Sequence, residues 1–432
     1  MKEKFISVQE AMNKGGGSVA VRGWVYRERG SNQFKFIVLR DSSNIIQCVL
    51  SKEKFEKQWD EIDGVTIESS VEIEGKIKKE ARAPTGYEIE VEKFELVSKA
   101  EPFPINKDIN EELLLDRRHL WLRSRKMTAI LKIRSTVFNA IHEYFRENDF
   151  YEYQSPIFQS VQAEGGSTLF EVKYFDKKTY LAQTWQLYAE PAIFALEKIY
   201  TIAPSFRAEK SKTSRHLTEY WHAEMEAAWA NFDEIQDYGE GLLKHIVQKV
   251  LENNKPELEI LGRDIKKLEP TIKKKFPRIT YDEALKILKE KCKMSVPWGK
   301  DLRTNEEDAL SKLHDTPVIV TNYPKEVKAF YMKETEGNSN VVNGCDFIAP
   351  EGYGEIIGGS ERESDIEKIK KRLVEMGEKV ENYSFYLDTR RYGSVPHGGF
   401  GMGVERVISW ICGLENIKDA IPFPRTPGRF TP

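Results

Sequence analysis

Alternating hydrophobic and polar positions run through the first hundred residues of the chain. Five such runs follow one another: SVAVRGWVYR, FKFIVLRD, NIIQCVLS, TIESSVEIEGKIKK and GYEIEVEKFELVS. A period of two is typical of strands with one buried face, and short strands at this spacing predict a small barrel. An amphipathic segment at residues 53–59 falls between the third and fourth strands, where an OB-fold carries its helix. The pattern favours an OB-fold barrel, with an SH3-like barrel as the alternative.

The pattern changes near residue 100, where two prolines introduce a polar stretch. We therefore predict a barrel domain at residues 1–101, a hinge or linker at 102–125 and a second domain at 126–432. Within the second domain, residues 230–340 mix helical and loop patterns and are interpreted as an insertion. The domain begins with apolar residues at helical spacing, which predict a helix with one buried face. These residues are Ile130, Ile133, Val137, Ile141 and Phe145.

Two strand patterns enclose a strongly basic loop, at residues 200–203 and 220–226. Between them lie Arg207, Glu209, Lys210, Lys212, Arg215 and His216. Charged residues occur on the strands as well as in the loop, which favours a phosphate-handling site over a solvated surface loop. The segment therefore predicts an antiparallel hairpin that carries the main chemistry of the chain.

Composition limits the possible functions. The chain has 432 residues, of which 40% are hydrophobic and 31% charged, as expected of a soluble protein with two or three domains. A formal net charge of −3 neither supports nor excludes a nucleic-acid partner. The four cysteines form no C-x-x-C pair, which argues against structural zinc and a disulfide framework. Because no signal peptide and no run of ~20 apolar residues is present, we expect a cytoplasmic protein with no membrane association.

Three segments together resemble a known enzyme family. FRAE, the basic loop and RHLTEYWHAEME resemble motif 2 of the class II aminoacyl-tRNA synthetases, in the form of the aspartate, asparagine and lysine branch. HGGFGMGVERVISW resembles motif 3, and YEYQSPIFQ resembles motif 1 with its proline at Pro156. The resemblance implies an α+β protein in which an N-terminal OB-fold barrel precedes a catalytic domain, built on an antiparallel β-sheet flanked by helices. It also implies a homodimer that forms through motif 1.

The same resemblance implies an ATP site formed by residues of motifs 2 and 3 together with Glu355. Its residues would be Arg207, Glu209, Arg215, His216, Glu355, Gly403 and Arg406. Arg207 and Arg406 are the implied catalytic residues. Asp346 and Glu355 stand on either side of a glycine-containing loop, and paired carboxylates near a triphosphate suit Mg²⁺. The resemblance implies that these two acids hold the metal.

A further set of residues is implied for the amino-acid pocket: Glu164, Gln186, Tyr188, Glu190 and Arg362. Two strands after Glu164 are expected to deliver Gln186 and Tyr188, followed by Glu190. The aspartate enzymes carry a lysine directly after Gln-Leu-Tyr, whereas this chain has Ala189 followed by Glu190. With Arg362 and Glu190 but no lysine, the pocket is expected to be nearly neutral. An aspartate carboxylate would be poorly paired there, and a buried charge without a full partner is costly. The predicted substrate is therefore L-asparagine.

The barrel is expected to hold the anticodon of a tRNA. GWVYRER, FKFIVLRD and the strand of Gln47 resemble the anticodon-binding domain of this branch. The resemblance implies that Phe36 stacks on the middle base, that Gln47 bonds it and that Arg29 supports the loop. We interpret Trp24, by contrast, as a core residue of the barrel.

The sequence thus predicts an enzyme that uses ATP to activate L-asparagine and transfers it to tRNA(Asn). One alternative is an aspartate enzyme that charges both tRNAs, against which Ala189 and Glu190 argue. Another is an asparagine synthetase derived from the same fold, against which the barrel residues Phe36 and Gln47 argue. A non-enzymatic binding protein is disfavoured because the implied ATP residues are present. The lysines Lys273, Lys274 and Lys275 are interpreted as a solvated face, with a contact to the tRNA acceptor stem as the alternative.

Overall fold

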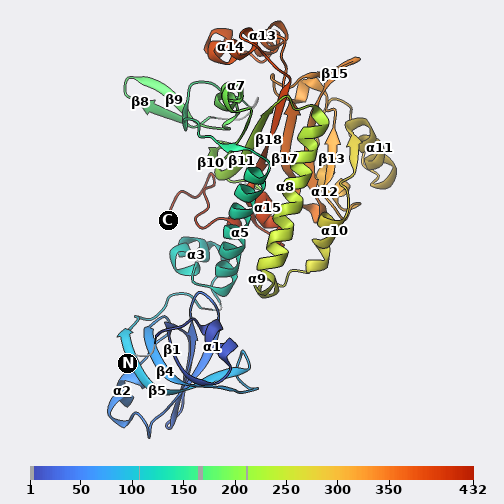
Figure 1. Cartoon of the computed structure of the whole chain (residues 1–432). Coiled ribbons are helices and arrows are strands. Elements are labelled where there is room, and N and C mark those ends of the chain that lie inside the picture. Colours follow the sequence, from blue (N-terminus) through green and yellow to red (C-terminus); the bar gives the residue numbers. More distant parts are fainter. Residues whose placement is uncertain (1–3, 107, 164–168, 211–212) are drawn as a thin grey trace. The chain divides into compact units, whose positions relative to one another are not determined.

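A computed structural model describes residues 4–106, 108–163, 169–210 and 213–432. The chain separates into two compact units, Met1–Leu120 and Trp121–Pro432 (Figure 1). Glu164 and Lys212, both singled out from the sequence, lie outside the described residues. Within the described residues, no helix combines the length and the apolar character that crossing a bilayer requires.

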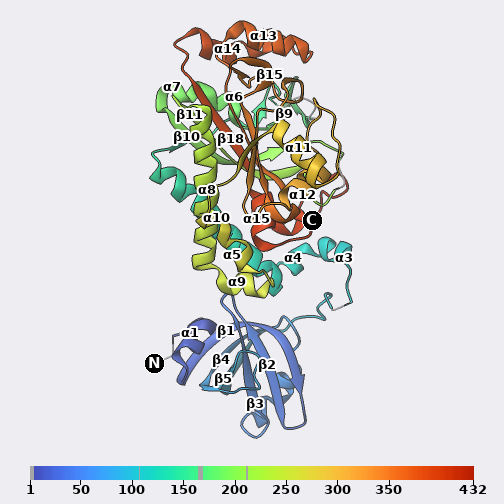
Figure 2. The same ribbon diagram turned by 90° about the vertical axis from the view of Figure 1, so that its right-hand side faces the viewer.

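The N-terminal unit is a closed barrel of five strands (Figure 2). The strands are β1 (Gly17–Gly30), β2 (Phe34–Arg40), β3 (Ile45–Ser51), β4 (Ser70–Lys79) and β5 (Tyr87–Ser98). They pair in the order β1-β2-β3-β5-β4, and all neighbours are antiparallel except β3 and β5. The short helix α2 (Trp59–Asp63) lies between β3 and β4, and α1 (Val8–Lys14) precedes the barrel. The predicted OB-fold barrel is confirmed.

Period-two alternation builds the interior of the barrel, as the sequence pattern predicts. Ile37 and Leu39 of β2 point inward and are fully buried, together with Ile46 and Cys48 of β3. Phe36 and Arg40 alternate with them on the outer side of β2 and are only partly buried. The outer side of β1 and β2 is therefore free to carry functional side chains.

An eight-stranded sheet forms the centre of the second unit. Its strands are β6 (Tyr151–Glu152), β10 (Lys198–Phe206), β11 (Glu219–Ala228), β12 (Arg278–Thr280), β13 (Val318–Thr321), β16 (Gly344–Ala349), β17 (Gly354–Glu361) and β18 (His397–Gly403). The order across the sheet is β12-β13-β16-β17-β18-β11-β10-β6. The six central strands pair antiparallel, and the edge strands β12 and β6 pair parallel. The sheet is therefore mixed at its edges and antiparallel where the sequence predicts the site.

Long helices cover this sheet, and α5 (Arg125–Glu147) lies beside α8 (Phe232–Asn253) in both views (Figures 1 and 2). The apolar positions predicted for the first helix are all fully buried in α5. Each helix begins at a residue whose side chain accepts backbone N–H groups, Ser124 for α5 and Asn231 for α8. Such caps satisfy donors that the first turn of a helix leaves free. The helix α15 (Val404–Cys412) completes the same core.

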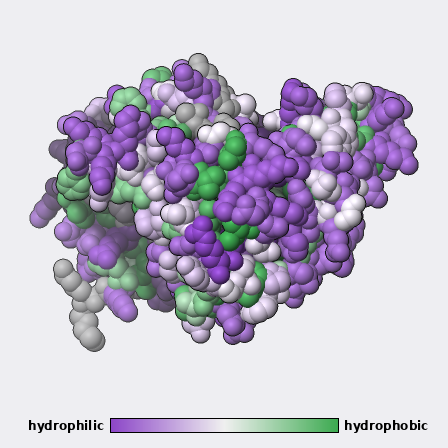
Figure 3. All heavy atoms as spheres, turned by 90° about the horizontal axis from the view of Figure 1, so that it is seen from above, coloured by the Kyte–Doolittle hydropathy of each residue, from purple (hydrophilic) through white to green (hydrophobic). Residues whose placement is uncertain are grey.

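Shorter elements surround the sheet. The remaining helices are α3 (Glu111–Asp116), α4 (Arg118–Trp121), α6 (Gln186–Ala189), α7 (Ile193–Leu196), α9 (Lys255–Ile260), α10 (Glu269–Lys273), α11 (Tyr281–Lys291), α12 (Thr304–Ser311), α13 (Ile366–Glu375) and α14 (Ser384–Arg391). The remaining strands are β7 (Phe158–Gln159), β8 (Glu171–Tyr174), β9 (Lys177–Leu181), β14 (Glu334–Thr335) and β15 (Asn338–Val342). Seen from the side of α13 and α14, the surface is mostly hydrophilic, with small hydrophobic areas between the polar side chains (Figure 3).

The order of the central strands explains where the chemistry gathers. Strand β11 of the hairpin pairs with β18, β18 pairs with β17, and β17 pairs with β16. Residues that are far apart in the sequence, on motif 2, on the acid-bearing strands and at the start of α15, are thereby brought to one part of the sheet. Two glycines of β18 allow this close pairing, since a Cβ at Gly398 or Gly399 would overlap atoms of the neighbouring strands.

Candidate active site

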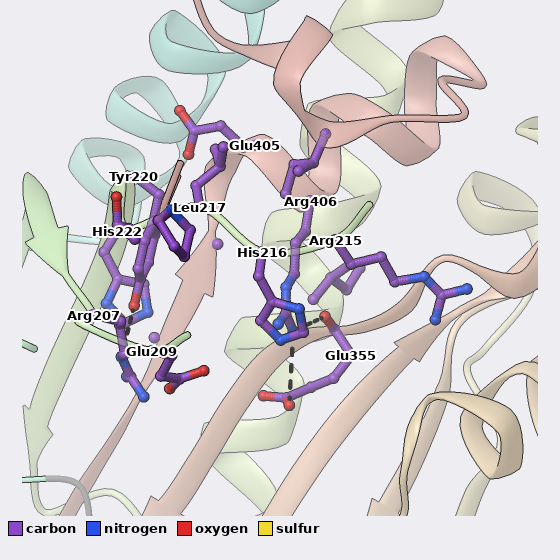
Figure 4. A pocket seen from close by; sticks show the side chains of 16 residues that line it. Arg207, Glu209, Arg215, His216, Leu217, Tyr220, His222, Glu355, Glu405 and Arg406 are labelled. Carbon is purple, nitrogen blue, oxygen red and sulfur yellow. Dashed lines mark hydrogen bonds and ion pairs between the residues drawn. The ribbon is translucent and has the colours of Figure 1, made fainter. Parts of the chain in front are cut away.

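A cavity of about 180 Å³ lies where the loop after β10 meets β17, β18 and α15 (Figure 4). All seven residues predicted for the ATP site line it: Arg207, Glu209, Arg215, His216, Glu355, Gly403 and Arg406. Tyr220, His222 and Glu405 also line it and were not predicted. Three arginines and two histidines line this cavity. They suit a polyphosphate, because guanidinium groups bind phosphate oxygens through charge-assisted hydrogen bonds.

Arg207 and Arg215 of this cavity are each held in place by a neighbouring side chain. Arg207 donates from Nε to the hydroxyl of Tyr220 at 3.2 Å. Arg215 donates from Nη2 to a carboxylate oxygen of Asp308 at 2.7 Å. Burial, together with the charge of Arg406, lowers the pKa of His216, so that its imidazole is neutral at pH 7.

A second and larger cavity, of about 670 Å³, adjoins the first. Arg207, His222, Glu355 and Gly401 line both cavities, so that the two share a wall. The predicted residues Gln186, Asp346 and Arg362 line the second cavity. Thr184, Glu224, Asp301, Lys328 and Tyr331 also line it, and none of these was predicted as a pocket residue from the sequence.

Asp346 on β16 and Glu355 on β17 lie on either side of Gly358. A Cβ at Gly358 would stand 2.9 Å from an oxygen of Glu355 and 3.7 Å from an oxygen of Asp346. Two carboxylates that converge in this way fit Mg²⁺, which binds hard oxygen ligands and takes one or two from the protein. Within the described residues, no cluster of three or more metal-ligating side chains is present. The case for a magnesium site therefore rests on Asp346 and Glu355 alone.

The ammonium of Lys328 lies 2.6 Å from an oxygen of Asp346 and 3.9 Å from the centre of the Tyr323 ring. Burial raises the pKa of Asp346 to about 7, although Lys328 acts in the opposite direction. Lys328 comes from a segment whose sequence, KEVKAFYMK, gives no spacing signal for chemistry. Only the folded chain shows that this cation lies beside the predicted metal ligand.

Arg362 stands in the wall of the second cavity, and its main partner is Glu226 of β11. Its Nε donates to both carboxylate oxygens of Glu226, at 3.2 and 3.3 Å, and its Nη1 donates to Ser360 at 2.6 Å. Burial raises the pKa of Glu226 to about 7, against the effect of Arg362. The alternation EYWHAEME placed Glu226 on a polar strand face but did not indicate its partner.

Glu190, expected to take part in the pocket, is fully buried and lies beneath the cavity wall instead of in it. Tyr188 is also absent from the wall, because its ring stacks on Phe385 with centroids 5.0 Å apart. The segment that carries both residues was expected to be a strand. Tyr188 lies in the helix α6 instead, and Glu190 directly follows this helix. The preceding strand, β9, ends at Leu181, and Thr184 and Trp185 turn the chain. Their turn is fixed by Glu224, which accepts the backbone N–H of Trp185 at 2.9 Å.

The outer face of the barrel carries the predicted anticodon residues. The guanidinium of Arg29 lies 4.7 Å from the centre of the Phe36 ring, and the two residues are direct partners across β1 and β2. Gln47 is buried and donates to Glu88 at 2.9 Å. Trp24 is 44% exposed, so its prediction as a core residue was wrong. It pairs with Arg40 across the same two strands, and this register places both on the outer face.

Comparison with known proteins defines the family. Residues 110–427 match the class II tRNA synthetases (D, K and N), and residues 19–97 match the OB-fold nucleic acid binding domain. The chain is therefore a member of the class II tRNA synthetases of this group.

Within this family, the similar proteins include several asparagine–tRNA ligases. The chain is 48% identical over 431 residues to the asparagine–tRNA ligase of Thermoplasma acidophilum, covering 99% of this chain and 100% of the relative. It matches the structure of asparaginyl-tRNA synthetase from Pyrococcus horikoshii complexed with asparaginyl-adenylate, with a TM-score of 0.95, 46% identity and full coverage of both chains. The corresponding complex from Entamoeba histolytica matches with a TM-score of 0.89 and 29% identity, again over both full chains.

Proposed function

We propose that the chain is an asparagine–tRNA ligase, which activates L-asparagine with ATP as asparaginyl-adenylate and then transfers the asparaginyl group to tRNA(Asn). One observation carries the proposal. The cationic cavity and the cavity of Arg362 adjoin and share Arg207, so that a nucleotide and an amino acid would meet at this side chain. The relatives, which are asparagine–tRNA ligases, support the choice of amino acid.

The first step is the attack of the asparagine α-carboxylate on the α-phosphorus of ATP, which releases pyrophosphate. Arg207 stabilises the negative charge that develops on the phosphoryl oxygens, because it stands where the two substrates meet. His216 and Arg406, with Arg215, hold the pyrophosphate end of the nucleotide, and Glu209 accepts a hydrogen bond from the adenine amino group. The protein supplies position and charge and no nucleophile of its own.

Asp346 and Glu355 would hold Mg²⁺ at the junction of the two cavities. When bound, the metal supplies positive charge that offsets the charge of the phosphates. Lys328 offsets part of the charge of Asp346, and Arg406 binds the backbone of Glu355. These two cations keep the acidic wall compatible with anionic substrates.

Selection of asparagine over aspartate follows from the surroundings of Arg362. Its guanidinium is already paired with Glu226, and Glu224 lies nearby on the same cavity wall. The side-chain carboxylate of aspartate would lie near the carboxylates of Glu226 and Glu224 and would have to share Arg362 with them. This arrangement disfavours aspartate. A neutral carboxamide can donate to an acid and accept from the arginine. We place Glu164 at the substrate ammonium by resemblance alone.

The barrel would bind the anticodon loop of the tRNA. An aromatic ring beside a guanidinium is the arrangement on which single-stranded bases stack. Phe36 and Arg29 form such a pair on the outer face of β1 and β2. Gln47 lies on the same face, although its amide is engaged by Glu88 and would have to exchange that partner for a base.

We also propose that the protein acts as a homodimer. The motif 1 segment leaves three large apolar side chains exposed, Tyr151 by 61%, Ile157 by 44% and Phe158 by 49%. Large apolar side chains that are exposed on one segment can mark an interaction site when they form a common patch. A second copy of the chain would cover these residues. Sedimentation at micromolar concentration should therefore give twice the mass of one chain.

The decisive experiment is amino-acid-dependent exchange of pyrophosphate into ATP, followed by charging of a tRNA(Asn) transcript. Exchange with asparagine, together with charging, is the expected result. Exchange with aspartate and charging of both tRNA(Asp) and tRNA(Asn) would identify a nondiscriminating aspartate enzyme. Formation of free asparagine from aspartate and ammonia would identify an asparagine synthetase.

A further inference from the structure

Three charged or titratable side chains lie entirely out of solvent beneath the amino-acid cavity. They are Glu190 at the end of α6, Arg390 at the end of α14 and His397 at the start of β18. The exposed fraction of each side chain is 0%. Neither Arg390 nor His397 lines either of the two cavities described above.

Glu190 is surrounded by donors. One of its oxygens lies 2.6 Å from Arg390 and 3.0 Å from Nε2 of His397. The other accepts from the hydroxyl of Tyr386 at 3.0 Å and from the amide of Gln186 at 2.9 Å. Burial opposes the ionisation of Glu190, but Arg390 and His397, with Arg362, hold its pKa well below the usual range. Glu190 is therefore a buried, fully partnered carboxylate.

Arg390 is fixed just as firmly. Its Nε donates to the carbonyl oxygen of Glu363 at 3.0 Å, and its Nη1 donates to Thr389 at 2.7 Å. Its Nη2 donates to the hydroxyl of Tyr386 at 2.8 Å in addition to its pairing with Glu190. Buried ion pairs of this kind add little net stability over a well-packed apolar core, so stability alone gives a weak reason for their presence.

Two contacts connect this buried cluster to the substrate cavity. Gln186 lines the cavity and donates to Glu190. Arg362 also lines the cavity, and its Nε lies 4.0 Å from Glu190 while it bonds both oxygens of Glu226. Arg362 thus stands between two buried carboxylates. Arg362 can pair with Glu226 as long as another cation neutralises Glu190.

We propose that Arg390 is a specificity-determining positioning residue: by pairing with Glu190 it leaves Arg362 bound to Glu226, and so presents to the substrate an arginine suited to a carboxamide. Without Arg390, the charge of Glu190 would draw Arg362 towards itself and away from Glu226. Gln186, which shares Glu190 as a partner, would shift as well. The inference rests on the proposed asparagine specificity and adds to it a residue that touches no substrate.

The test compares four variants with the wild type in pyrophosphate exchange, with asparagine and with aspartate. They are Arg390→Met, Arg390→Lys, the double variant Glu190→Gln/Arg390→Met, and Arg391→Met as the matched control. Arg391 is the next residue along α14, is exposed, and pairs only locally with Asp388 at 2.6 Å. The double variant removes both charges together, so that nothing competes with Glu226 for Arg362.

Arg390→Met should raise the KM for asparagine at least about thirtyfold, the effect of removing one partner of a buried hydrogen-bonded charge pair. The KM for ATP should stay at the wild-type value, because no member of the cluster lines the ATP cavity. The ratio of kcat/KM for asparagine to that for aspartate should fall, since aspartate gains nothing from the intact arrangement. Arg390→Lys should lie between the wild type and Arg390→Met, and the double variant should return close to the wild type.

A purely structural role would reduce folded protein and kcat for both amino acids while leaving KM and their ratio unchanged, and that result would overturn the inference. If Arg390→Met does not fold, the KM for asparagine is compared among the wild type, the double variant and Arg390→Lys. An equal KM in all three would overturn the inference. A wild-type protein that fails to activate asparagine contradicts the proposed function itself. The two failures are therefore distinguishable, because only the comparison among variants bears on Arg390.

Discussion

Arg406 donates a hydrogen bond from Nη1 to the backbone carbonyl of Glu355 at 2.7 Å, and the same guanidinium lies 3.8 Å from the Glu355 carboxylate. This contact joins the first turn of α15 to the strand that carries the proposed metal ligand. Arg406, the proposed phosphate-binding cation, is thereby held beside Glu355, the proposed metal ligand. The position of each group is fixed by the other before any substrate binds, which is the kind of preorganisation that lowers the barrier of a phosphoryl-transfer step.

Replacing Arg207 by alanine should slow adenylate formation by about a hundredfold to a thousandfold, because one preorganised donor to the developing charge is lost. The measurement is asparagine-dependent pyrophosphate exchange at saturating ATP and asparagine. Lys210→Ala is the matched control, since Lys210 belongs to the same loop, is exposed and lines neither cavity. A rate of exchange close to that of the wild type would remove Arg207 from the proposed role.

Replacing Asp346 by asparagine or Glu355 by glutamine should raise the Mg²⁺ concentration needed for half-maximal exchange by about tenfold or more, since each change removes an anionic oxygen ligand. Binding of Mn²⁺ to the protein, followed by its electron paramagnetic resonance signal, gives a readout that does not depend on turnover. Asp315→Asn serves as control because Asp315 is an exposed acid paired with Lys274. Unchanged metal dependence in both variants would place the metal elsewhere.

Replacing Phe36 by alanine should lower tRNA charging through KM for the tRNA, by about fivefold to a hundredfold, the range expected for loss of one stacked base. Pyrophosphate exchange should keep its wild-type rate, because Phe36 belongs to the N-terminal barrel and adenylate formation needs no tRNA. Phe34→Ala is the control, since Phe34 is a similarly placed aromatic residue, 44% exposed on the same strand. Equal KM values for tRNA in the wild type and Phe36→Ala would exclude the stacking role.

Local patterns in the sequence predicted the barrel, the hairpin and the helix α5, because each depends on periodicity within one segment. Six of the seven residues proposed for the ATP site could be named because motif 2 and motif 3 hold them at fixed spacing; Glu355 is the exception. The strand predicted around Gln186 was wrong. The turn before Gln186 is held by the hydrogen bond that Trp185 donates to Glu224, and Glu224 lies 39 residues away on another strand. The pairs of Glu190 with Arg390 and of Lys328 with Asp346 join separate segments, and no local pattern contains them.

The pH dependence of stability gives a last prediction. The pKa of Glu226 is raised by burial to about 7, from an ordinary value of 4.5. Between these two values the folded chain holds a proton that the unfolded chain has lost, so the free energy of unfolding falls as the pH rises from 4.5 to 7. A shift of this size corresponds to at most about 3 kcal/mol above pH 7. Denaturant midpoints followed by tryptophan fluorescence at pH 5, 6, 7 and 8 measure the decline.

Glu226→Gln removes this titration, so the decline in the free energy of unfolding between pH 5 and 8 should become smaller. It should not vanish, because burial also raises the pKa of Asp346 and of Glu307 to about 7. Glu224→Gln is the matched control on the same strand. Although burial opposes ionisation, His222 and other hydrogen-bonding partners lower the pKa of Glu224, and the stability this group contributes is lost only as the pH falls below about 4.5. If the free energy of unfolding declined equally in the wild type and in Glu226→Gln, Arg362 would keep Glu226 ionised throughout this pH range. The pocket would then be neutral only because the charges of Arg362 and Glu226 cancel.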